Sequence, residues 1–507
     1  MNTVTQLAIA GALLLSAPGL ALHAGTAASD RQAPAAASAR AEEAESAAPR
    51  LRQRIPGLME QAGVQGVQIA VLSGGKTAWH ASFGLANAET KAPVTDDSVF
   101  EAASLSKPVF AYAVLSLVDA GQIDLDTPLS RYLPGRYDVG DDTRLDLITP
   151  RHVLSHRSGF PNWRPGSDPL KIYFTPGDRF SYSGEGFVYL AAAVERITGQ
   201  TLEAFMRRTV FDPLGMSSSS YVWQSRYERL KVYNHSLLGD LAGRRTPWRA
   251  NAAASLHTTA GDYARFVAAV VAGQGLRPAT ARAMLSPQSR PDERGINTAT
   301  AAPTGRSAPS LAWGLGIGLE QEAEAWSVWH WGDNGTTKAY VAASPSRGTG
   351  VVFFANSENG LLLAPPVIAE VMGGASPALA WLKQRGPAPA FGPFVAALRA
   401  TGAVQALEAY RASRHARPSD PAIDEETMNR IGYVLLRGKK VKDAIEVFTQ
   451  NVADHPESWN VHDSLGEALA ADGQTALAIK AYERSLELNP ANTGGAEALK
   501  KLRGVSR

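Results

Sequence analysis

A serine and a lysine lie three residues apart at the start of an apolar stretch of this sequence. After Ser104 and Lys107, apolar residues recur at helical spacing up to Gly121, a typical helix stop. The pattern predicts a helix over about residues 105–120, in which Pro108 is tolerated because it lies in the first turn. Residues three apart share a helix face, so the Lys107 ammonium group can reach the Ser104 hydroxyl. Free N–H groups of the first turn surround that hydroxyl. A nucleophile, a base and half of an oxyanion hole would therefore lie in one turn.

The same spacing occurs a second time, at Ser73 and Lys76. A chain of this length contains Ser-x-x-Lys about once or twice by chance. Two glycines separate Ser73 from Lys76, and the runs on either side, over residues 67–83, are rich in β-branched and aromatic residues. This pattern predicts a β-hairpin with Ser73 in the turn and Lys76 as a solvated charge. We therefore expect Ser104, and not Ser73, to be the nucleophile.

Tyr182 is the second candidate, because it stands just before a predicted helix that continues through residues 191–199. A tyrosine hydroxyl is a poor base at its reference pKa of about 10. It needs a neighbouring cation that favours its phenolate or lets it relay protons, and Lys107 could be that cation. Taken alone, Tyr182 is more typical of a half-buried core tyrosine.

The third candidate segment contains three β-type runs over residues 327–354, with His330 and Gly332 at the end of the first run. Gly332 has no Cβ, which would let a substrate lie against this strand as an additional β-edge partner. The next backbone N–H, that of Asp333, could be a second oxyanion donor. By itself, His330 is more typical of a structural histidine than of a catalytic one.

Two further histidines, His152 and His156, lie four residues apart in a short helix predicted to begin at Pro150. This spacing can hold a metal ion, but no third ligand lies at a usable distance along the chain. Histidines on a helix surface or in packing are therefore the favoured interpretation. We predict no metal site.

Together, these segments resemble those of the serine β-lactamase-like hydrolase superfamily, which includes penicillin-binding proteins, class C β-lactamases and related esterases and D-aminopeptidases. The resemblance covers roughly residues 50–383 and extends to the phrases VLSHRSGFPNW, FDPLGM and HTTAGDYARF. It implies an α/β fold, with an antiparallel sheet flanked by helices, a mostly helical subdomain beside it and the site between them.

The resemblance also implies roles for individual residues. Ser104 would be the nucleophile of an acyl-enzyme, and Lys107 would take or share its proton. Tyr182 would relay protons to the leaving group and help to activate the hydrolytic water. The N–H groups of Ser104 and Asp333 would stabilise the tetrahedral oxyanion. No metal or organic cofactor is implied.

Two departures from the family's motifs bear on the substrate. The tyrosine motif of the β-lactamases ends in Asn, whose amide holds a side-chain amide of the substrate, whereas Gly184 stands here. Their strand motif begins with Lys, which faces the β-lactam carboxylate, whereas His330 stands here. A histidine near its reference pKa of about 6.5 is mostly neutral at pH 7 and holds a carboxylate weakly. Both changes favour an esterase, or a peptidase of different specificity, over an efficient β-lactamase.

Composition excludes several kinds of site. The chain has no cysteine, which excludes disulfides, thiolate metal sites and a cysteine nucleophile. A net charge of +2 gives no reason to expect nucleic acid or acidic lipid as a partner. With 507 residues, of which 45% are apolar, we expect two or more domains.

The N-terminal segment predicts export to the periplasm or the medium. Residues 7–22 are apolar but too few to cross a bilayer comfortably, and small residues follow at 24–28. We predict a signal peptide over residues 1–28 and a disordered, alanine-rich spacer over residues 29–49. No Lys or Arg precedes the apolar run, so a membrane anchor or a misassigned start codon is the alternative.

The C-terminal segment contains a repeat with a period of 34 residues, which is typical of tetratricopeptide repeats. The matched pairs are Ile431-Gly432 with Leu465-Gly466, Ala444 with Ala478, Phe448 with Tyr482, and Pro456 with Pro490. An ordinary helical bundle is the alternative interpretation. Two repeats fall short of the three or so that a free-standing stack needs. We therefore expect helices at 394–412 and 495–502, or the hydrolase itself, to cover the ends.

We therefore predict an exported serine hydrolase over residues 50–384, a Pro/Gly linker over 385–394 and an all-α tetratricopeptide-like domain over 395–507. Its substrate would be a small-molecule or peptide ester or amide. The C-terminal domain would pack against the hydrolase, and its concave face would narrow the mouth of the site or bind a protein or peptide partner. The alternative is a non-catalytic binding or scaffold protein that uses the repeats. Ser104, Lys107 and Tyr182 argue against it, because a pseudoenzyme has no physical reason to retain all three.

Overall fold

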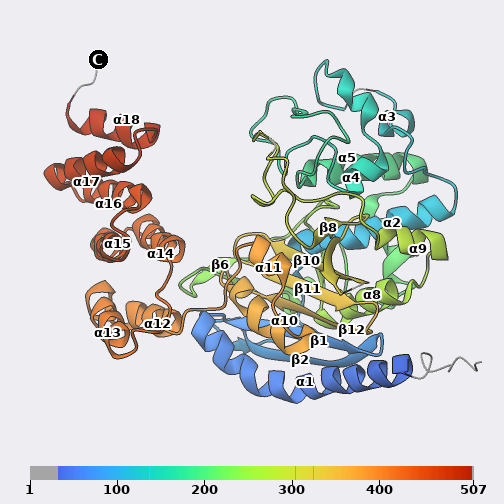
Figure 1. The fold of residues 1–507 in the computed structure, drawn as a ribbon, viewed down its shortest axis with the longest axis horizontal. Helices are drawn as coiled ribbons and strands as arrows, with labels where there is room; N and C mark the ends of the chain where they lie inside the picture. Colours follow the sequence, from blue (N-terminus) through green and yellow to red (C-terminus); the bar gives the residue numbers. More distant parts are fainter. Residues whose placement is uncertain (1–31, 136, 303, 324, 505–507) are drawn as a thin grey trace, which may run out of the picture.

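An eight-stranded antiparallel sheet is the centre of the molecule (Figure 1). The computed structural model describes residues 32–135, 137–302, 304–323 and 325–504, with side chains from residue 47 onward. The predicted signal peptide lies outside the described residues. The strand order is β3-β2-β1-β12-β11-β10-β9-β8, so the first and last strands of the domain meet where β1 pairs with β12. The strands are β1 (Gly66–Ser73), β2 (Lys76–Asn87), β3 (Ala92–Pro93), β8 (Leu311–Trp313), β9 (Gly318–Glu322), β10 (Ala325–Asp333), β11 (Lys338–Ser344) and β12 (Thr349–Ala355).

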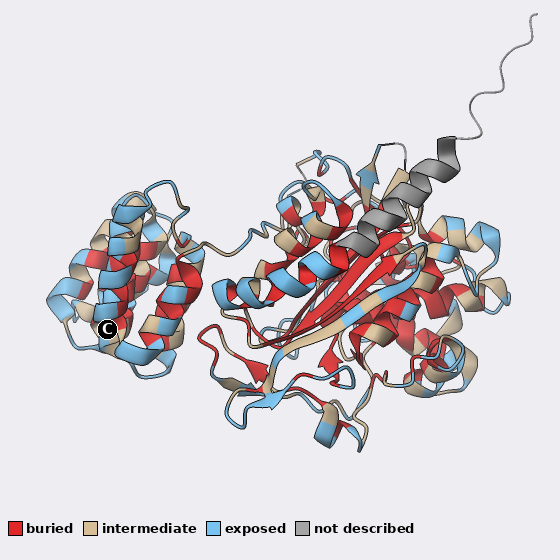
Figure 2. Ribbon diagram, turned by 90° about the horizontal axis from the view of Figure 1, so that it is seen from below, coloured by how far each residue is buried: buried red, intermediate tan, exposed pale blue. Residues whose placement is uncertain are grey.

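Alternating residues of the sheet contribute to two separate apolar cores. On β1, Ala70 and Leu72 face one core, whereas Ile69 and Val71 face the other, as the period of two along a strand requires. The first face is covered by α2 (Ser106–Asp119) and α8 (Ala260–Ala272), and the second by α1 (Gln32–Ala62) and α10 (Ala364–Met372). Figure 2 shows the central strands as almost wholly buried, with α1 lying across them. The predicted hairpin of residues 67–83 and the three predicted strands of residues 327–354 are confirmed.

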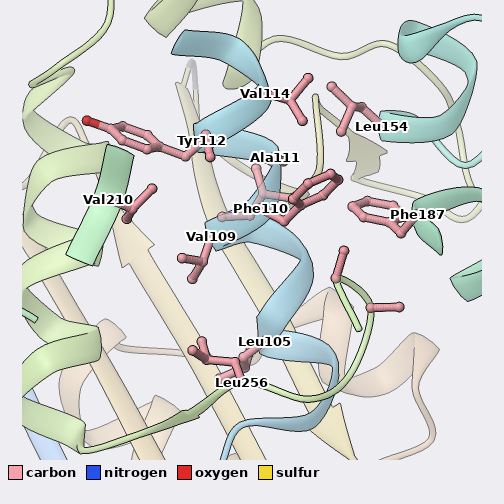
Figure 3. Close-up of a cluster of buried hydrophobic side chains, with 14 of the residues drawn as sticks. Leu105, Val109, Phe110, Ala111, Tyr112, Val114, Leu154, Phe187, Val210 and Leu256 are labelled. Carbon is pink, nitrogen blue, oxygen red and sulfur yellow. The ribbon is translucent and has the colours of Figure 1, made fainter. Parts of the chain in front are cut away.

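A mostly helical subdomain packs on the α2 side of the sheet. Its helices are α3 (Leu129–Tyr132), α4 (Pro150–Leu154), α5 (Gly184–Thr198), α6 (Leu202–Met206), α7 (Tyr227–Leu230) and α9 (Pro278–Met284). The predicted helix of residues 105–120 is confirmed as α2, preceded by the 3-10 turn η1 (Ala103–Leu105). Figure 3 shows apolar side chains of α2 against Leu154, Phe187, Val210 and Leu256 from four other segments. The serine helix is therefore buried on nearly all sides.

Short elements connect these layers. Two small strand pairs are formed by β4 (Phe100–Glu101) with β7 (His257–Thr258), and by β5 (Asn234–His235) with β6 (Leu241–Gly243). The remaining turns and helices are η2 (Thr143–Leu147), the π-helical turn η3 (Arg207–Phe211), η4 (Gly360–Leu363) and α11 (Pro377–Trp381). The pairing of β4 with β7 matters for the site, because it fixes the strand that leads into Ser104.

The C-terminal domain consists of helices only. They are α12 (Phe391–Thr401), α13 (Ala403–Ala416), α14 (Glu425–Arg437), α15 (Val441–Asp454), α16 (Trp459–Ala471), α17 (Thr475–Leu488) and α18 (Thr493–Leu502). The pair α16–α17 begins 34 residues after the pair α14–α15 at both helices. A Cβ on Gly432 would lie 2.4 Å from the Phe448 ring, and one on Gly466 would lie 3.1 Å from the Tyr482 ring. The same glycine–aromatic contact thus closes both helix pairs.

The C-terminal domain packs against the hydrolase domain. A Cβ on Gly392 of α12 would lie 2.1 Å from the Glu60 carbonyl oxygen of α1, so these helices touch through their backbones. Leu237 and Leu238, from the turn between β5 and β6, belong to the core of the C-terminal domain. Figure 1 shows α14–α18 well away from α2 and α5. The expectation that the repeats narrow the mouth of the site is therefore wrong.

Two predicted boundaries differ from the structure. The alanine-rich stretch of residues 29–49 was expected to be a disordered spacer, but α1 begins at Gln32. Alanine, glutamate and arginine are strong helix formers, and Leu51 anchors the same helix in the sheet core. The linker expected at 385–394 ends earlier, because Phe391 is buried in the C-terminal core and begins α12. Within the described ranges, no helix is both long and apolar enough to cross a membrane.

Candidate active site

Ser104 lies in the tight turn η1, which several contacts hold in place. Ala103 has a φ of +49°, a left-handed conformation that non-glycine residues rarely adopt. The Ser106 hydroxyl donates to the Ala103 carbonyl oxygen at 2.6 Å and accepts the Leu256 N–H at 3.0 Å. The Tyr263 hydroxyl donates to the Leu105 carbonyl oxygen at 3.0 Å. The nucleophile candidate therefore has a strained backbone that neighbouring elements keep from relaxing.

Lys107 is completely buried beside Ser104. Its Nζ lies 3.1 Å from Ser104 Oγ and donates to the Ala253 carbonyl oxygen at 2.9 Å. Burial lowers the pKa of Lys107 from 10.5 to about 7. At neutral pH much of this lysine is uncharged, and a neutral amine can accept the Ser104 proton. The contact with the Ala253 carbonyl could not be predicted from the sequence, because every residue has a backbone carbonyl group.

Tyr182 is buried beside both Lys107 and Ser104. The Lys107 Nζ lies 4.7 Å from the centre of the Tyr182 ring, over its face and not at its hydroxyl. Burial raises the pKa of Tyr182 above its usual value of 10, and the nearby Ser104 side chain opposes this only in part. Within the described ranges, no hydrogen bond of ordinary geometry reaches the Tyr182 hydroxyl. In the free protein this hydroxyl is therefore neutral, and Lys107 does not convert it to the phenolate.

His156 stacks on the Tyr182 ring at a centroid distance of 4.3 Å. Burial holds the pKa of His156 well below its usual value of 6.5, with the Lys107 charge as a second cause. The Ser183 N–H donates to His156 Nδ1 at 3.0 Å, so the proton of the neutral ring is on Nε2. His152 lies elsewhere, beside the Leu147 carbonyl oxygen at 3.0 Å. In the described part of the chain, no three His, Asp or Glu side chains form a group that could hold a metal ion.

The last residues of β10 form an open strand edge next to the serine turn. Strand β9 pairs with β10 only as far as Trp329, so no strand of the described chain borders residues 330–333 on that side. The Asn334 N–H donates to the Thr337 carbonyl oxygen on the β11 side, at 3.3 Å. Because N–H groups alternate along a strand, the Asp333 N–H faces the open edge. Ser104 has no hydrogen-bond acceptor for its own N–H among the described residues. Both predicted oxyanion donors are thus unoccupied.

The structure adds a second reason for a glycine at position 332, besides the predicted room for a substrate. A Cβ at this position would lie 2.4 Å from the Ala102 carbonyl oxygen. The glycine therefore lets the serine turn pack closely against β10 in the free protein. Contact between these two segments brings Ser104 to the strand edge that carries the Asp333 N–H.

The sequence predicts that His330 meets a substrate carboxylate, but the structure leaves its ring no exposed surface. Its side chain is fully buried among aromatic rings, including Trp331 at a centroid distance of 5.1 Å. Its Nδ1 donates to the Trp331 carbonyl oxygen at 2.8 Å. Burial lowers the pKa of His330 to about 3, and the Lys107 charge acts in the same direction. An uncharged, enclosed ring offers a substrate carboxylate no positive charge, so weak binding of a carboxylate stays the prediction.

Glu101 is a site residue that sequence reasoning missed. Its buried carboxylate accepts a hydrogen bond from the Asn334 side chain and lies 3.7 Å from Arg245 Nε. Asn334 directly follows Asp333, so Glu101 ties the loop after β10 to the strand that leads into Ser104. A single glutamate between apolar residues gives no sequence signal of this role.

Known proteins share this fold and these segments. The chain matches the family described as Beta-lactamase over residues 51–370. It is 30% identical over 196 residues to Penicillin-binding protein 4* of Bacillus subtilis, covering 34% of this chain and 42% of that protein. It is 29% identical over 296 residues to Esterase EstB of Burkholderia gladioli, covering 48% of this chain and 71% of that protein. The octameric penicillin-binding protein homologue from Pyrococcus abyssi has a TM-score of 0.53 at 20% identity, covering 69% of this chain and 80% of that one, a likeness of fold alone.

Proposed function

The chain belongs to the beta-lactamase family of serine hydrolases, and from this premise we propose that it forms an acyl-enzyme on Ser104 and hydrolyses esters or amides. One observation carries the proposal. Lys107 is completely buried, its Nζ is 3.1 Å from Ser104 Oγ, and its pKa is lowered to about 7. An amine that is largely neutral at physiological pH and touches a serine hydroxyl is suited to activate it.

In the proposed reaction, Ser104 Oγ attacks the substrate carbonyl carbon while its proton moves to the neutral Lys107 Nζ. The carbonyl oxygen becomes an oxyanion that accepts hydrogen bonds from the N–H groups of Ser104 and Asp333. One such donor lowers the activation free energy of acyl transfer by about 3 to 4 kcal/mol. The intermediate then collapses, the leaving group takes a proton, and the acyl group remains on Ser104.

Tyr182 and Lys107 share the proton transfers that follow. The ammonium group of Lys107 has a proton to return, and the neutral Tyr182 hydroxyl, whose neighbour is the Ser104 side chain, can donate its own proton to the leaving group and be reprotonated from Lys107. Water then attacks the acyl carbon and gives its proton to the neutral Lys107 amine. The bond from that carbon to Ser104 Oγ breaks, Ser104 takes the proton back from Lys107, and the acid is released. His156 and the buried His330 take no part in these transfers, because burial keeps the pKa of each ring far below neutrality.

We propose that esters are better substrates than penicillins or cephalosporins. A β-lactam carries a carboxylate, and the first residue of the strand motif, His330, is uncharged and enclosed. Gly184 offers no side-chain amide at the end of the tyrosine motif. The relative Esterase EstB is named as an esterase, which supports this preference.

Intact-mass measurement tests the proposal. The full chain is incubated in parallel with a fluorophosphonate, a penicillin and p-nitrophenyl butyrate, and a Ser104→Ala variant is treated in the same way. We expect a fluorophosphonate adduct on the unmodified chain only, and turnover of the ester faster than that of the penicillin. Labelling that survives in the Ser104→Ala variant would contradict the nucleophile assignment. A higher kcat/KM for the penicillin would contradict the substrate preference.

We propose a second role for the C-terminal domain, as a tetratricopeptide-like surface for a protein or peptide partner of an exported enzyme. Support comes from the repeated glycine–aromatic contact and from two exposed apolar side chains, Trp459 and Leu477. Truncation after Lys383 tests its independence from catalysis. Because the domain packs on α1, we expect a lower melting temperature but an unchanged kcat/KM for p-nitrophenyl butyrate. A large change in that kcat/KM would instead make the domain part of the catalytic unit.

A further inference from the structure

Trp163 is an exposed aromatic side chain beside the buried catalytic lysine candidate. Its exposed fraction is 43%, which is unusual for a large apolar side chain in this protein. The Lys107 Nζ lies 5.8 Å from the centre of its ring. One side of the indole thus approaches the reactive centre, and another side is open to solvent.

The backbone around Trp163 is held firmly against the start of α5. The Asn162 carbonyl oxygen accepts the N–H groups of Gly184 at 3.0 Å and Glu185 at 3.1 Å. The N–H of Arg164 donates to the Glu185 carboxylate at 3.1 Å. Hydrogen bonds on both sides of Trp163 therefore fix its backbone, while part of its ring stays open to solvent. A rigid aromatic surface loses little conformational entropy when a ligand packs on it.

Gly184 leaves room for this ring. A Cβ on Gly184 would lie 3.0 Å from two carbon atoms of the Trp163 ring and 2.7 Å from the Asn162 carbonyl oxygen. Any larger side chain at position 184 would push the indole away. The space beside Gly184, the second residue after Tyr182, is thus shared by the edge of the Trp163 ring and the Asn162 carbonyl oxygen, while Asn162 Oδ1 accepts the Gly184 N–H at 3.1 Å.

We propose that Trp163 is a specificity-determining residue, forming a subsite for a flat, apolar group of the substrate. The inference rests on the proposed function, since it places this group next to the carbonyl that Ser104 attacks. The group belongs to the acyl part or to the alcohol or amine part of the substrate. In both cases it packs against the indole, where stacking and burial of apolar area favour aromatic over small aliphatic groups.

Two series of esters distinguish whether the aromatic group belongs to the acyl part or to the alcohol part of the substrate. In the acyl series, p-nitrophenyl phenylacetate is compared with p-nitrophenyl acetate, and in the alcohol series, benzyl acetate is compared with ethyl acetate. For each pair, the ratio of kcat/KM values measures the preference for an aromatic group. We expect Trp163→Ala to lower this ratio roughly ten-fold in one series and to leave the other unchanged. Trp163→Phe should retain most of the preference, and Gly184→Ala should weaken it by displacing the ring.

Trp79→Ala is the matched control, because this tryptophan lies on β2, which three strands separate from β10, and its ring centre lies 5.7 Å from the Arg52 guanidinium carbon. We expect both ratios to be unchanged in this variant. Fluorophosphonate labelling of Ser104 reports separately on the catalytic centre. If Trp163→Ala is still labelled and neither ratio changes, the subsite is disproved and the proposed function stands. If the unmodified chain is not labelled, the proposed function itself fails.

Discussion

The chain contains two Ser-x-x-Lys segments, which share their spacing but differ in secondary structure and in the burial of the lysine. Ser73 and Lys76 pair across the turn of a hairpin, and Lys76 is exposed to solvent. Ser104 and Lys107 are enclosed between the sheet and the helical subdomain, and Lys107 has no accessible surface. In the hairpin, Ser73 ends β1 and Lys76 begins β2. In the second segment, Ser104 lies in the turn η1 and Lys107 lies in the first turn of α2.

This difference shows that burial, and not spacing, equips a lysine for base chemistry. An exposed ammonium group keeps its hydration, but Lys107 loses it, and within the described ranges it hydrogen-bonds only to the Ala253 carbonyl and the Ser104 hydroxyl. Loss of hydration disfavours the charged form and lowers the pKa of Lys107 to about 7. The groups that enclose it come from segments far apart in the chain.

The largest effect should come from removing the two serine hydroxyls in turn. We expect Ser104→Ala to lower kcat/KM for p-nitrophenyl butyrate by at least about 10³-fold, because no acyl-enzyme can form. Ser73→Ala should stay within about two-fold of the unmodified chain, since surface changes seldom disturb a distant site. Equal losses in the two variants, measured by initial rates, would break the comparison.

Removing the two lysine charges should give the next largest effect. Lys107→Met keeps an apolar stem in the buried site but no base, so we expect kcat to fall on the order of 10²- to 10³-fold. In Lys107→Arg, kcat should fall as far, because a guanidinium group stays protonated and cannot accept the serine proton. Lys76→Met serves as the control and should leave kcat unchanged. An active Lys107→Arg variant would show that the charge matters and that deprotonation does not.

The pH dependence should follow Lys107 as well. We expect kcat/KM to rise with pH and to level off above about 7, with a roughly ten-fold fall per pH unit below it. Stability should follow the same group. Its folded-state pKa of about 7 lies below the unfolded value of 10.5, so the unfolded chain binds more protons between these pH values. Unfolding free energy from this group therefore rises with pH across that window, and in Lys107→Met this rise should be absent. A flat activity profile from pH 5 to 8 would contradict the assignment.

Sequence patterns were sufficient for the serine helix, the hairpin and the strands of residues 327–354, because each has a clear hydrophobic period or a local turn signal. The resemblance to a family brought Ser104, Lys107 and Tyr182 together. It did not reveal that His330 is enclosed, because burial depends on rings from distant segments such as Trp313. Ala253 and Glu101 were missed for a related reason. One contributes a backbone carbonyl and the other a single carboxylate, and neither repeats along the chain.

The smallest effect concerns the backbone of the two segments. Both contain left-handed residues, but in the hairpin these are Gly74 and Gly75, whereas before Ser104 the left-handed residue is Ala103. A glycine adopts this conformation freely, and an alanine does so at a cost on the order of 1 kcal/mol. Strain in the hairpin is thus avoided, and strain before Ser104 is retained.

Two reciprocal substitutions measure what this strain does. Gly75→Ala adds a Cβ that would meet no atom within 4 Å, so only the backbone cost remains. We expect about 1 kcal/mol lower stability and an unchanged kcat. Ala103→Gly relieves the strain but makes the unfolded chain more flexible and removes a buried methyl group, so these contributions largely offset one another. Stability should then stay within about 1 kcal/mol of the unmodified chain, as measured by urea unfolding. Because the freed turn no longer holds Ser104 at one place beside Lys107, kcat should nevertheless fall several-fold. If Ala103→Gly leaves kcat unchanged, the left-handed alanine does not position the nucleophile, and the hydrogen bonds of Ser106 and Tyr263 are sufficient to do so.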